Sequence, residues 1–197
     1  MTDGEFVEKL LLRKLQKEKI FQIRDKKEKE TEICKFLFQA LSKAASIISY
    51  KSIGFEVDLN ECMSSLCEKI KIYYPRIKGE KLEFVEALAW KIGEFSIPEP
   101  VGEATILPEF SDYCVIPSLG YNQRGFRLGR GGGFYDKTLE NLPSEKIIGV
   151  SFSEAFPVDF EEESHDIKVG KLITEKETFF FGNSEIPKAD NINGLGT

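Results

Sequence analysis

Helix-like spacing of apolar residues dominates the first part of the chain. Across residues 5–43 these residues recur at intervals of three and four, first from Phe6 to Leu11 and again from Ile33 to Leu41. Residues 14–29 between them are so highly charged that they form either a solvated helix or a loose connection. The pattern predicts an N-terminal helical arm.

Short β-like runs and helical segments then alternate. An apolar run at 47–50 is followed by Asp58 and Glu61, whose spacing of three predicts the capping box of a helix. Apolar residues at helical intervals occupy 59–70, and a second β-like run follows at 70–74. Strand, helix and strand joined by short connections are typical of a right-handed parallel crossover.

Apolar runs bounded by turn residues predict the remaining strands. These lie at residues 81–88, 113–116, 147–152, 169–174 and 178–181. Prolines hold residues 97–100 in an extended conformation. The expected fold is α/β, a Rossmann-like three-layer fold with a mostly parallel central sheet. We expect residues 1–182 to form this single domain and residues 183–197 to be a flexible tail.

Composition narrows the class of protein. The chain has 197 residues, 41% of them hydrophobic and 12% aromatic, which is enough for one domain with a sizeable core. A net charge of −6 disfavours general nucleic-acid binding, and acidic residues interleave with the N-terminal lysines. Four cysteines without a C-x-x-C pair and a single histidine argue against a zinc site. No run of about 18 apolar residues and no cleavable signal pattern is present, so we expect a soluble cytoplasmic protein without a membrane partner.

The glycine-rich stretch at residues 127–136 is the strongest candidate for a ligand site. Four glycines in five positions let backbone N–H groups approach an anion, and Arg127 and Arg130 add positive charge. Helical spacing over 134–142 predicts a helix whose first N–H groups point into the same loop. Neither a Walker loop nor a G-x-G-x-x-G pattern is present. We favour a phosphate cradle of another kind over the simpler interpretation, a glycine-rich surface turn.

Two aspartates are candidates for metal binding, because polyphosphate chemistry needs a divalent cation held by carboxylates. Asp136 lies at the mouth of the glycine loop, and Asp166 follows the strand that begins near residue 147. Each has a simpler interpretation, Asp136 as a partner of the helix dipole and Asp166 as a surface charge in an acidic run. Lys9 and Arg13, four residues apart, place two cations on one helix face, where they are either solvent-exposed or held by an anion between them.

Residues 115–136 closely resemble the signature of the 5-formyltetrahydrofolate cyclo-ligase family, also called 5,10-methenyltetrahydrofolate synthetases. That signature ends in R-L-G-x-G-[GK]-G-[FY]-Y-D, and the chain has R-L-G-R-G-G-G-F-Y-D at residues 127–136. Further agreement lies, in order, at Lys9-x-x-x-Arg13, Glu56-Val57-Asp58, Tyr74-Pro75-Arg76, Ile97-Pro98-Glu99-Pro100 and His165-Asp166. Ser118 and Asn122 replace the usual Gly and Asp of the signature, and Gly132 stands where some members have Lys.

The resemblance implies an ATP- and Mg²⁺-dependent ligase that converts 5-formyltetrahydrofolate to 5,10-methenyltetrahydrofolate and releases ADP and phosphate. A formamide oxygen is a poor leaving group, so the γ-phosphoryl group is placed on it first. N10 then attacks the activated carbon and phosphate departs. The implied substrate is a small molecule, with or without a polyglutamate tail, and we expect the enzyme to act as a monomer.

The resemblance also implies roles for individual residues. The implied ATP-binding set is Lys9, Arg13, Arg127, Gly129, Arg130, Gly131, Gly132, Gly133, Phe134, Tyr135 and Asp136. The implied substrate-binding set is Lys51, Phe55, Glu56, Arg130, Gly131, Gly132, Gly133 and Phe134. The implied catalytic residues are Arg127, Arg130 and Tyr135, and the implied Mg²⁺ ligands are Asp136 and Asp166.

Two other functions fit parts of the pattern. A phosphosugar isomerase-like enzyme on a related sheet would need an acid or base in the cleft, for which His165 is a weak candidate. A non-catalytic nucleotide or folate binder descended from the family is the other possibility. The intact Arg127, Asp136 and Asp166 argue against it.

Overall fold

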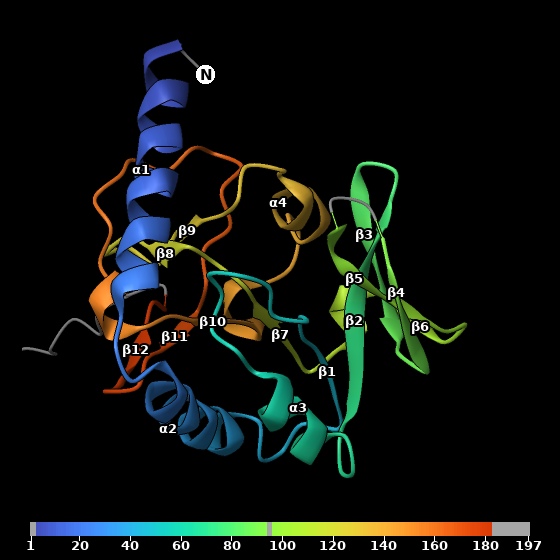
Figure 1. The fold of residues 1–197 in the computed structure, drawn as a ribbon. Coiled ribbons are helices and arrows are strands. Elements are labelled where there is room, and N and C mark those ends of the chain that lie inside the picture. Colours follow the sequence, from blue (N-terminus) through green and yellow to red (C-terminus); the bar gives the residue numbers. More distant parts are fainter. Residues whose placement is uncertain (1–2, 94–95, 183–197) are drawn as a thin grey trace, which may run out of the picture.

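The central element of the computed structural model, which describes residues 3–93 and 96–182, is an eight-stranded sheet in the order β12-β11-β10-β7-β1-β2-β3-β6 (Figure 1). Its five middle strands run parallel, and they are β1 (Ser46–Ile48), β2 (Lys71–Lys78), β7 (Tyr113–Ile116), β10 (Ile147–Val150) and β11 (Lys171–Ile173). The antiparallel strands lie at the two ends, and they are β3 (Lys81–Glu86), β6 (Thr105–Ile106) and β12 (Thr178–Phe180). The predicted α/β fold with a mostly parallel sheet is confirmed.

The N-terminal region forms two helices, α1 (Asp3–Gln22) and α2 (Lys26–Ala40). They are separated at Asp25, whose φ of 53° and ψ of 38° are left-handed and cannot continue a helix. The charged stretch 14–29 is therefore helical with one break. The predicted tail, residues 183–197, lies outside the described part of the chain.

Helix α3 (Asn60–Leu66) follows β1, as the spacing predicts, but its capping box is wrong. Leu59 takes the N-cap position, and no side chain caps the helix there. Asp58 instead accepts the N–H of Asn60 at 2.9 Å, and Glu61 forms an exposed ion pair with Lys27. The Asp58 carboxylate thus sits one residue too early to form the predicted reciprocal cap.

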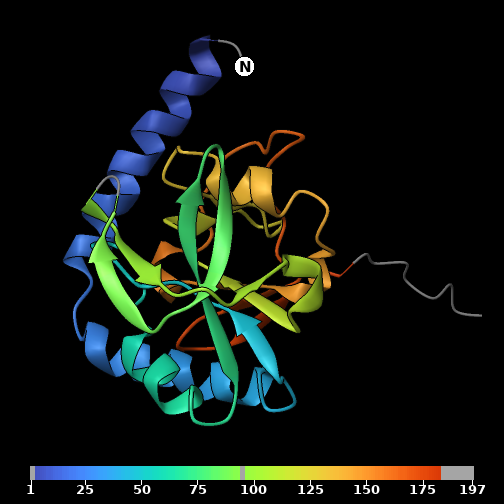
Figure 2. The ribbon, with the colours of Figure 1, turned by 90° about the vertical axis from the view of Figure 1, so that its right-hand side faces the viewer.

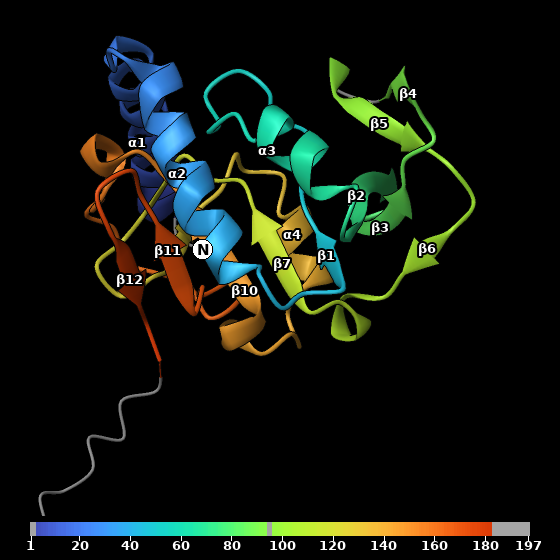
Figure 3. The same ribbon diagram turned by 90° about the horizontal axis from the view of Figure 1, so that it is seen from below.

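The two faces of the sheet carry different cores, because successive side chains of a strand point to opposite faces. Ile47 and Val115 join a buried cluster with residues of α2 and α3. Ile48 and Ile116, their neighbours in sequence, join a second cluster that contains Leu139, just after helix α4 (Phe134–Thr138). Figure 1 shows α2 and α3 below the sheet and α4 above it, and Figure 3 shows α1, α2 and α3 along one side. The arrangement has three layers.

Small hairpins and short 3₁₀ turns lie outside the main sheet. The hairpins are β4 (Ala89–Ile92) with β5 (Pro98–Val101), and β8 (Gly120–Tyr121) with β9 (Arg127–Leu128). The 3₁₀ turns span Pro108–Phe110, Ser144–Lys146 and Ser153–Ala155. β5 packs against β2 and β3 at the end of the sheet that faces the viewer in Figure 2. Among the described residues, no helix is both long and apolar enough to cross a bilayer.

The β8–β9 hairpin occupies a stretch for which the sequence pattern predicts only a loop. Its turn is held by Asn122, whose Oδ1 accepts the N–H groups of Arg124 and Phe126 at 3.0 Å each. The Nδ2 of Asn122 donates to the carbonyl of Phe160 at 3.3 Å and to Glu162 at 3.0 Å. This turn delivers the chain to Arg127 and the glycine-rich loop.

Candidate functional site

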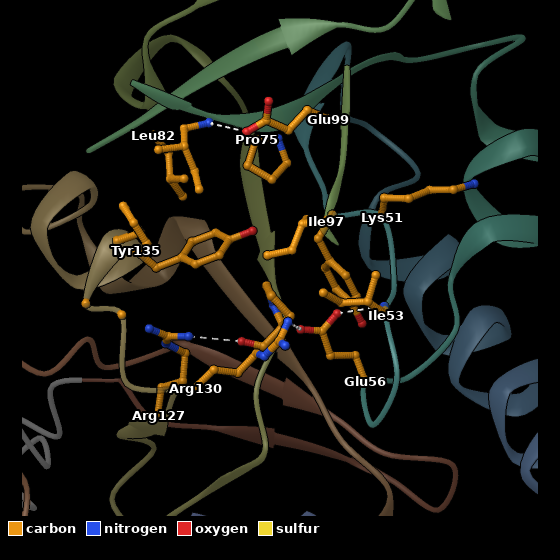
Figure 4. Close-up of a pocket in the computed structure, with 16 residues that line it drawn as sticks. Lys51, Ile53, Glu56, Pro75, Leu82, Ile97, Glu99, Arg127, Arg130 and Tyr135 are labelled. Atoms are coloured by element: carbon orange, nitrogen blue, oxygen red, sulfur yellow. Dashed lines mark hydrogen bonds and ion pairs between the residues drawn. The ribbon is translucent and has the colours of Figure 1, made fainter. Parts of the chain in front are cut away.

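A cavity of about 350 Å³ lies beside the glycine-rich loop (Figure 4). It is lined by Tyr50, Lys51, Ile53, Glu56, Pro75, Ile77, Leu82, Ile97, Glu99, Pro117, Arg127, Arg130, Gly132, Gly133, Phe134 and Tyr135. These residues come from the segments after β1 and β7, from β2 and β3, from the β4–β5 hairpin and from the glycine-rich stretch 127–136. The cavity wall is mainly apolar and aromatic, with a few charged groups, which is typical of a small-molecule site.

Arg127 anchors the loop side of the cavity. Its Nη2 donates to Asp136 Oδ2 at 2.8 Å and its Nη1 donates to the carbonyl of Pro117 at 3.2 Å. The guanidinium lies 5.2 Å from the centre of the Tyr135 ring, a cation–π contact. Its Nε is buried and has no hydrogen-bond partner within the described ranges. The guanidinium is therefore held in place by two hydrogen bonds and the ring contact.

At three positions of the loop the structure shows why the residue is glycine. A Cβ on Gly129 would lie 2.8 Å from Nη2 of Arg127, so a larger residue would displace the guanidinium. Gly131 and Gly133 have φ values of +102° and +66°, which L side chains rarely adopt. Helix α4 ends at Thr138, so it is shorter than the predicted 134–142.

Arg13 of helix α1 contacts this loop, and Lys9, one turn earlier in the helix, contacts two acidic residues near it in the fold. Lys9 Nζ donates to Glu163 at 2.6 Å and to Asp166 at 2.8 Å, and Arg13 Nε donates to the carbonyl of Gly129 at 3.0 Å. Burial acts to lower the pKa of Lys9, but its hydrogen bonds to Asp166 and Glu163 outweigh burial and leave the pKa raised. Burial lowers the pKa of Arg13 against the attraction of the same carboxylates. The two like charges are therefore compensated by acidic residues.

Asp136 contacts the backbone next to Asp166. Asp136 Oδ1 accepts the N–H of Ile167, the residue after Asp166, at 3.4 Å. Asp166 Oδ2 also accepts the N–H of Glu163 at 2.8 Å. Within the described residues, no group of three or more acidic, His or Cys side chains forms a metal cage. Mg²⁺ is usually held by one or two carboxylates together with substrate phosphates, and this pair fits that donor set.

Glu56 is the most perturbed acid of the cavity. Its side chain is 6% exposed, its Oε2 accepts the N–H of Ile53 at 3.0 Å, and its Oε1 lies 3.8 Å from Nη1 of Arg130. Burial raises the pKa of Glu56 to about 7, against the lowering effects of the Ile53 N–H and the two arginines. Glu56 thus changes its charge near neutral pH.

The implied substrate-binding residues divide between the cavity and its surroundings. Lys51 lines the cavity, but its Nζ lies 5.3 Å from the centre of the Trp90 ring and points away from the other labelled side chains (Figure 4). Phe55 is not among the lining residues and packs against the core cluster on the helix side. Gly131 faces the guanidinium of Arg13. Of these three residues only Lys51 lines the cavity, and sequence spacing alone does not show this difference.

Sequence patterns do not predict several of the lining residues as site residues. Ile77 and Leu82 have the appearance of ordinary strand residues, and no local signal marks them. Pro75 is unusual inside a strand and belongs to the Tyr74-Pro75-Arg76 block that agrees with the family. Glu99 is different, because a carboxylate between two prolines in an extended apolar segment is unusual. Its 7% exposure shows that the segment turns this carboxylate inward.

Comparisons with known proteins agree on one family. A sequence model described as the 5-formyltetrahydrofolate cyclo-ligase family matches residues 8–175. The 5-formyltetrahydrofolate cyclo-ligase of Mycolicibacterium smegmatis is 33% identical over 79 residues, 40% of this chain and 37% of that protein. The enzyme of the same name from Haemophilus influenzae is 29% identical over 120 residues, 56% of this chain and 64% of that protein. The alignments thus span less than two thirds of either relative.

Two solved structures share the fold. The 5,10-methenyltetrahydrofolate synthetase of Aquifex aeolicus has a TM-score of 0.77 at 23% identity, covering 94% of this chain and 99% of that one. The 5,10-methenyltetrahydrofolate synthetase of Mycoplasma pneumoniae has a TM-score of 0.70 at 24% identity, covering 85% of this chain and 98% of that one. At these identities the likeness concerns the fold.

Proposed function

The chain belongs to the 5-formyltetrahydrofolate cyclo-ligase family, and from this premise we propose that it is an ATP- and Mg²⁺-dependent ligase. It converts 5-formyltetrahydrofolate to 5,10-methenyltetrahydrofolate and releases ADP and phosphate. One observation carries the proposal: the glycine-rich loop forms a wall of the cavity and also touches Arg13 of α1. A phosphate site and a ring-binding site therefore share one stretch of backbone.

The two sides of this loop suit two ligands. Gly132 and Gly133 line the cavity, whereas Gly129 and Gly131 lie against the guanidinium groups of Arg127 and Arg13. We assign the triphosphate to the side with Lys9, Arg13 and the glycine N–H groups, and the folate ring to the cavity. This arrangement brings a γ-phosphoryl group next to the cavity without any large movement of the loop.

The chemistry needs positioning and charge neutralisation more than a side-chain nucleophile. The formyl oxygen accepts the phosphoryl group, N10 attacks the activated carbon, and phosphate leaves. Arg127 is held rigidly and Arg130 projects into the cavity, so both offer N–H donors to oxygens that gain charge. Burial raises the pKa of Tyr135 well above its ordinary value, so its phenol stays protonated and serves as a donor.

We assign the metal and folate contacts to residues around the same loop and cavity. Mg²⁺ supplies charge neutralisation on the polyphosphate, and Asp136 and Asp166 would hold it. Lys9 now neutralises Asp166, so a bound cation would share or replace that role. Glu56 offers its carboxylate to a ring N–H of the folate, and Phe134 packs against the ring.

The proposal is tested by the absorbance of methenyltetrahydrofolate after the protein is mixed with 5-formyltetrahydrofolate, ATP and Mg²⁺. We expect product formation that stops when either ATP or Mg²⁺ is omitted. Binding of folate and nucleotide without product would indicate a non-catalytic binder. Absence of both product and binding would refute the assignment of the cavity.

A further inference from the structure

Glu99 is a carboxylate in the cavity that the chemistry above leaves without a role. Its side chain is 9% exposed, and its Oε1 accepts the backbone N–H of Ile77 at 3.2 Å. Lys91, its partner across the β4–β5 ladder, has its Nζ 4.0 Å from Oε2, beyond hydrogen-bond distance. A carboxylate can accept about four hydrogen bonds. Glu99 therefore retains accepting capacity on the side that lines the cavity.

The hairpin is shaped around this carboxylate. A Cβ on Gly93 would lie 2.2 Å from Cδ of Glu99 and 2.4 Å from Oε2, so only glycine leaves room for the side chain. Gly93 donates its N–H to the carbonyl of Ile97 at 2.8 Å, which holds the two arms of the hairpin together. The Glu99 side chain is thus held in one place from two sides, by Ile77 and by Gly93.

The cavity has two chemically different ends (Figure 4). Glu99 lies at one end, and Glu56, Arg127 and Arg130 lie at the other, with Tyr135 between them. Glu56 is 3.8 Å from Arg130, so the cationic end has its own carboxylate. A ligand that spans the cavity must present an electron-rich group to the arginines and N–H donors to Glu99.

We propose that Glu99 binds the exocyclic amino group of the pteridine ring and thereby selects 2-amino heterocycles, an inference that rests on the proposed function. In 5-formyltetrahydrofolate the formyl group is on N5, and the amino group is on the far edge of the same bicycle. If the arginine end takes the formyl oxygen, the amino edge points to the end where Glu99 lies. A carboxylate suits this group, because a charged acceptor binds an amino donor more strongly than a neutral one does.

The test is a thermodynamic cycle in which one change is made in the protein, at Glu99, and the other in the ligand, at its 2-amino group. Binding of 5-formyltetrahydrofolate and of its analogue without the 2-amino group is measured calorimetrically, without ATP, for the wild type and for Glu99→Gln. The glutamine keeps an acceptor for the Ile77 N–H but presents no charged acceptor to the ligand. We expect the wild type to favour the amino compound by about tenfold or more, and the variant to lose most of this preference.

Controls separate recognition from stability. Glu103→Gln changes an exposed acid just beyond β5 and should leave both affinities unchanged. Glu99→Gln should raise the KM for folate while the KM for ATP stays the same, whereas a purely structural defect would affect both. A preference that persists in Glu99→Gln but disappears in Glu56→Gln would overturn the inference and leave the proposed function intact. A wild type that neither binds folate nor forms product would overturn both.

Discussion

Arg127 and Asp136 form an ion pair of 2.8 Å, and their side chains are 5% and 12% exposed. The pair spans the glycine-rich loop, because Arg127 begins strand β9 and Asp136 lies in the first turn of α4. It therefore fixes the shape of the loop in addition to placing charge there. A pair so buried is costly to break from one side, since the remaining charge loses its compensation.

Asp136→Asn should weaken both stability and turnover. Asparagine still accepts a hydrogen bond from Arg127 but no longer compensates its charge, so we expect the free energy of unfolding to fall by about 1–3 kcal/mol. We expect kcat to fall roughly 100-fold, because the carboxylate that orients the Arg127 guanidinium is lost. Urea denaturation and the methenyl absorbance assay measure the two effects. Asp159→Asn, at an exposed position, is the matched control, and wild-type turnover in Asp136→Asn would contradict the assigned role.

Glu56 should make stability depend on pH. Its pKa is about 7 in the folded protein against an ordinary value of 4.5, so the folded state binds this proton more tightly than the unfolded chain does. Its contribution to stability is therefore full below pH 4.5 and is lost as the pH rises to about 7. Relative to wild type, Glu56→Gln should gain about 3 kcal/mol in free energy of unfolding between pH 4.5 and pH 8. Urea denaturation at several pH values in this range measures the difference, and the exposed Glu68→Gln serves as control. If the free energy of unfolding of wild type and of Glu56→Gln changed with pH in the same way, the prediction would be wrong.

Lys9→Met should destabilise the protein in a way that Mg²⁺ partly reverses. The substitution leaves Glu163 and Asp166 without their shared cation, and we expect a loss of about 1–3 kcal/mol. Thermal melts in MgCl₂ and in NaCl of equal ionic strength separate cation binding from screening. The stabilisation by Mg²⁺ should vanish in the double variant that combines Lys9→Met with Asp166→Asn. Lys14→Met, on the exposed side of the same helix, is the control and should show neither effect. Equal melting temperatures of Lys9→Met in the two salts would argue against a cation site.

Asn122→Asp, which restores the usual residue of the family signature, should destabilise this chain. An aspartate still accepts the N–H groups of Arg124 and Phe126 but cannot donate to the carbonyl of Phe160, and it faces the carboxylate of Glu162. We expect a loss of about 1–3 kcal/mol at neutral pH, measured by urea denaturation. The exposed Asn141→Asp serves as control. Unchanged stability would mean that the turn does not need the amide donor.

Local patterns determined much of this protein in advance. Apolar runs such as 113–116 predict strands, because a buried strand needs consecutive apolar residues, and these runs do form the middle of the sheet. The glycines beside Arg127 predict a binding loop, because only glycine allows such close approach and such backbone angles. The capping box at Asp58 failed because cap geometry depends on the dihedral angles of single residues, which spacing does not fix.

Tertiary structure alone decided which distant residues meet. Lys9 and Asp166 are 157 positions apart, and nothing local indicates that they form an ion pair. Glu99 faces a cavity only because the β4–β5 hairpin packs against β2, and Phe55 turns to the core only because of the packing of its neighbours. The sequence by itself thus determined the middle strands of the main sheet and the glycine loop, which depend on neighbouring residues. The cavity and its charge pairs depend on the packing of separate elements, and packing is a property of the whole chain.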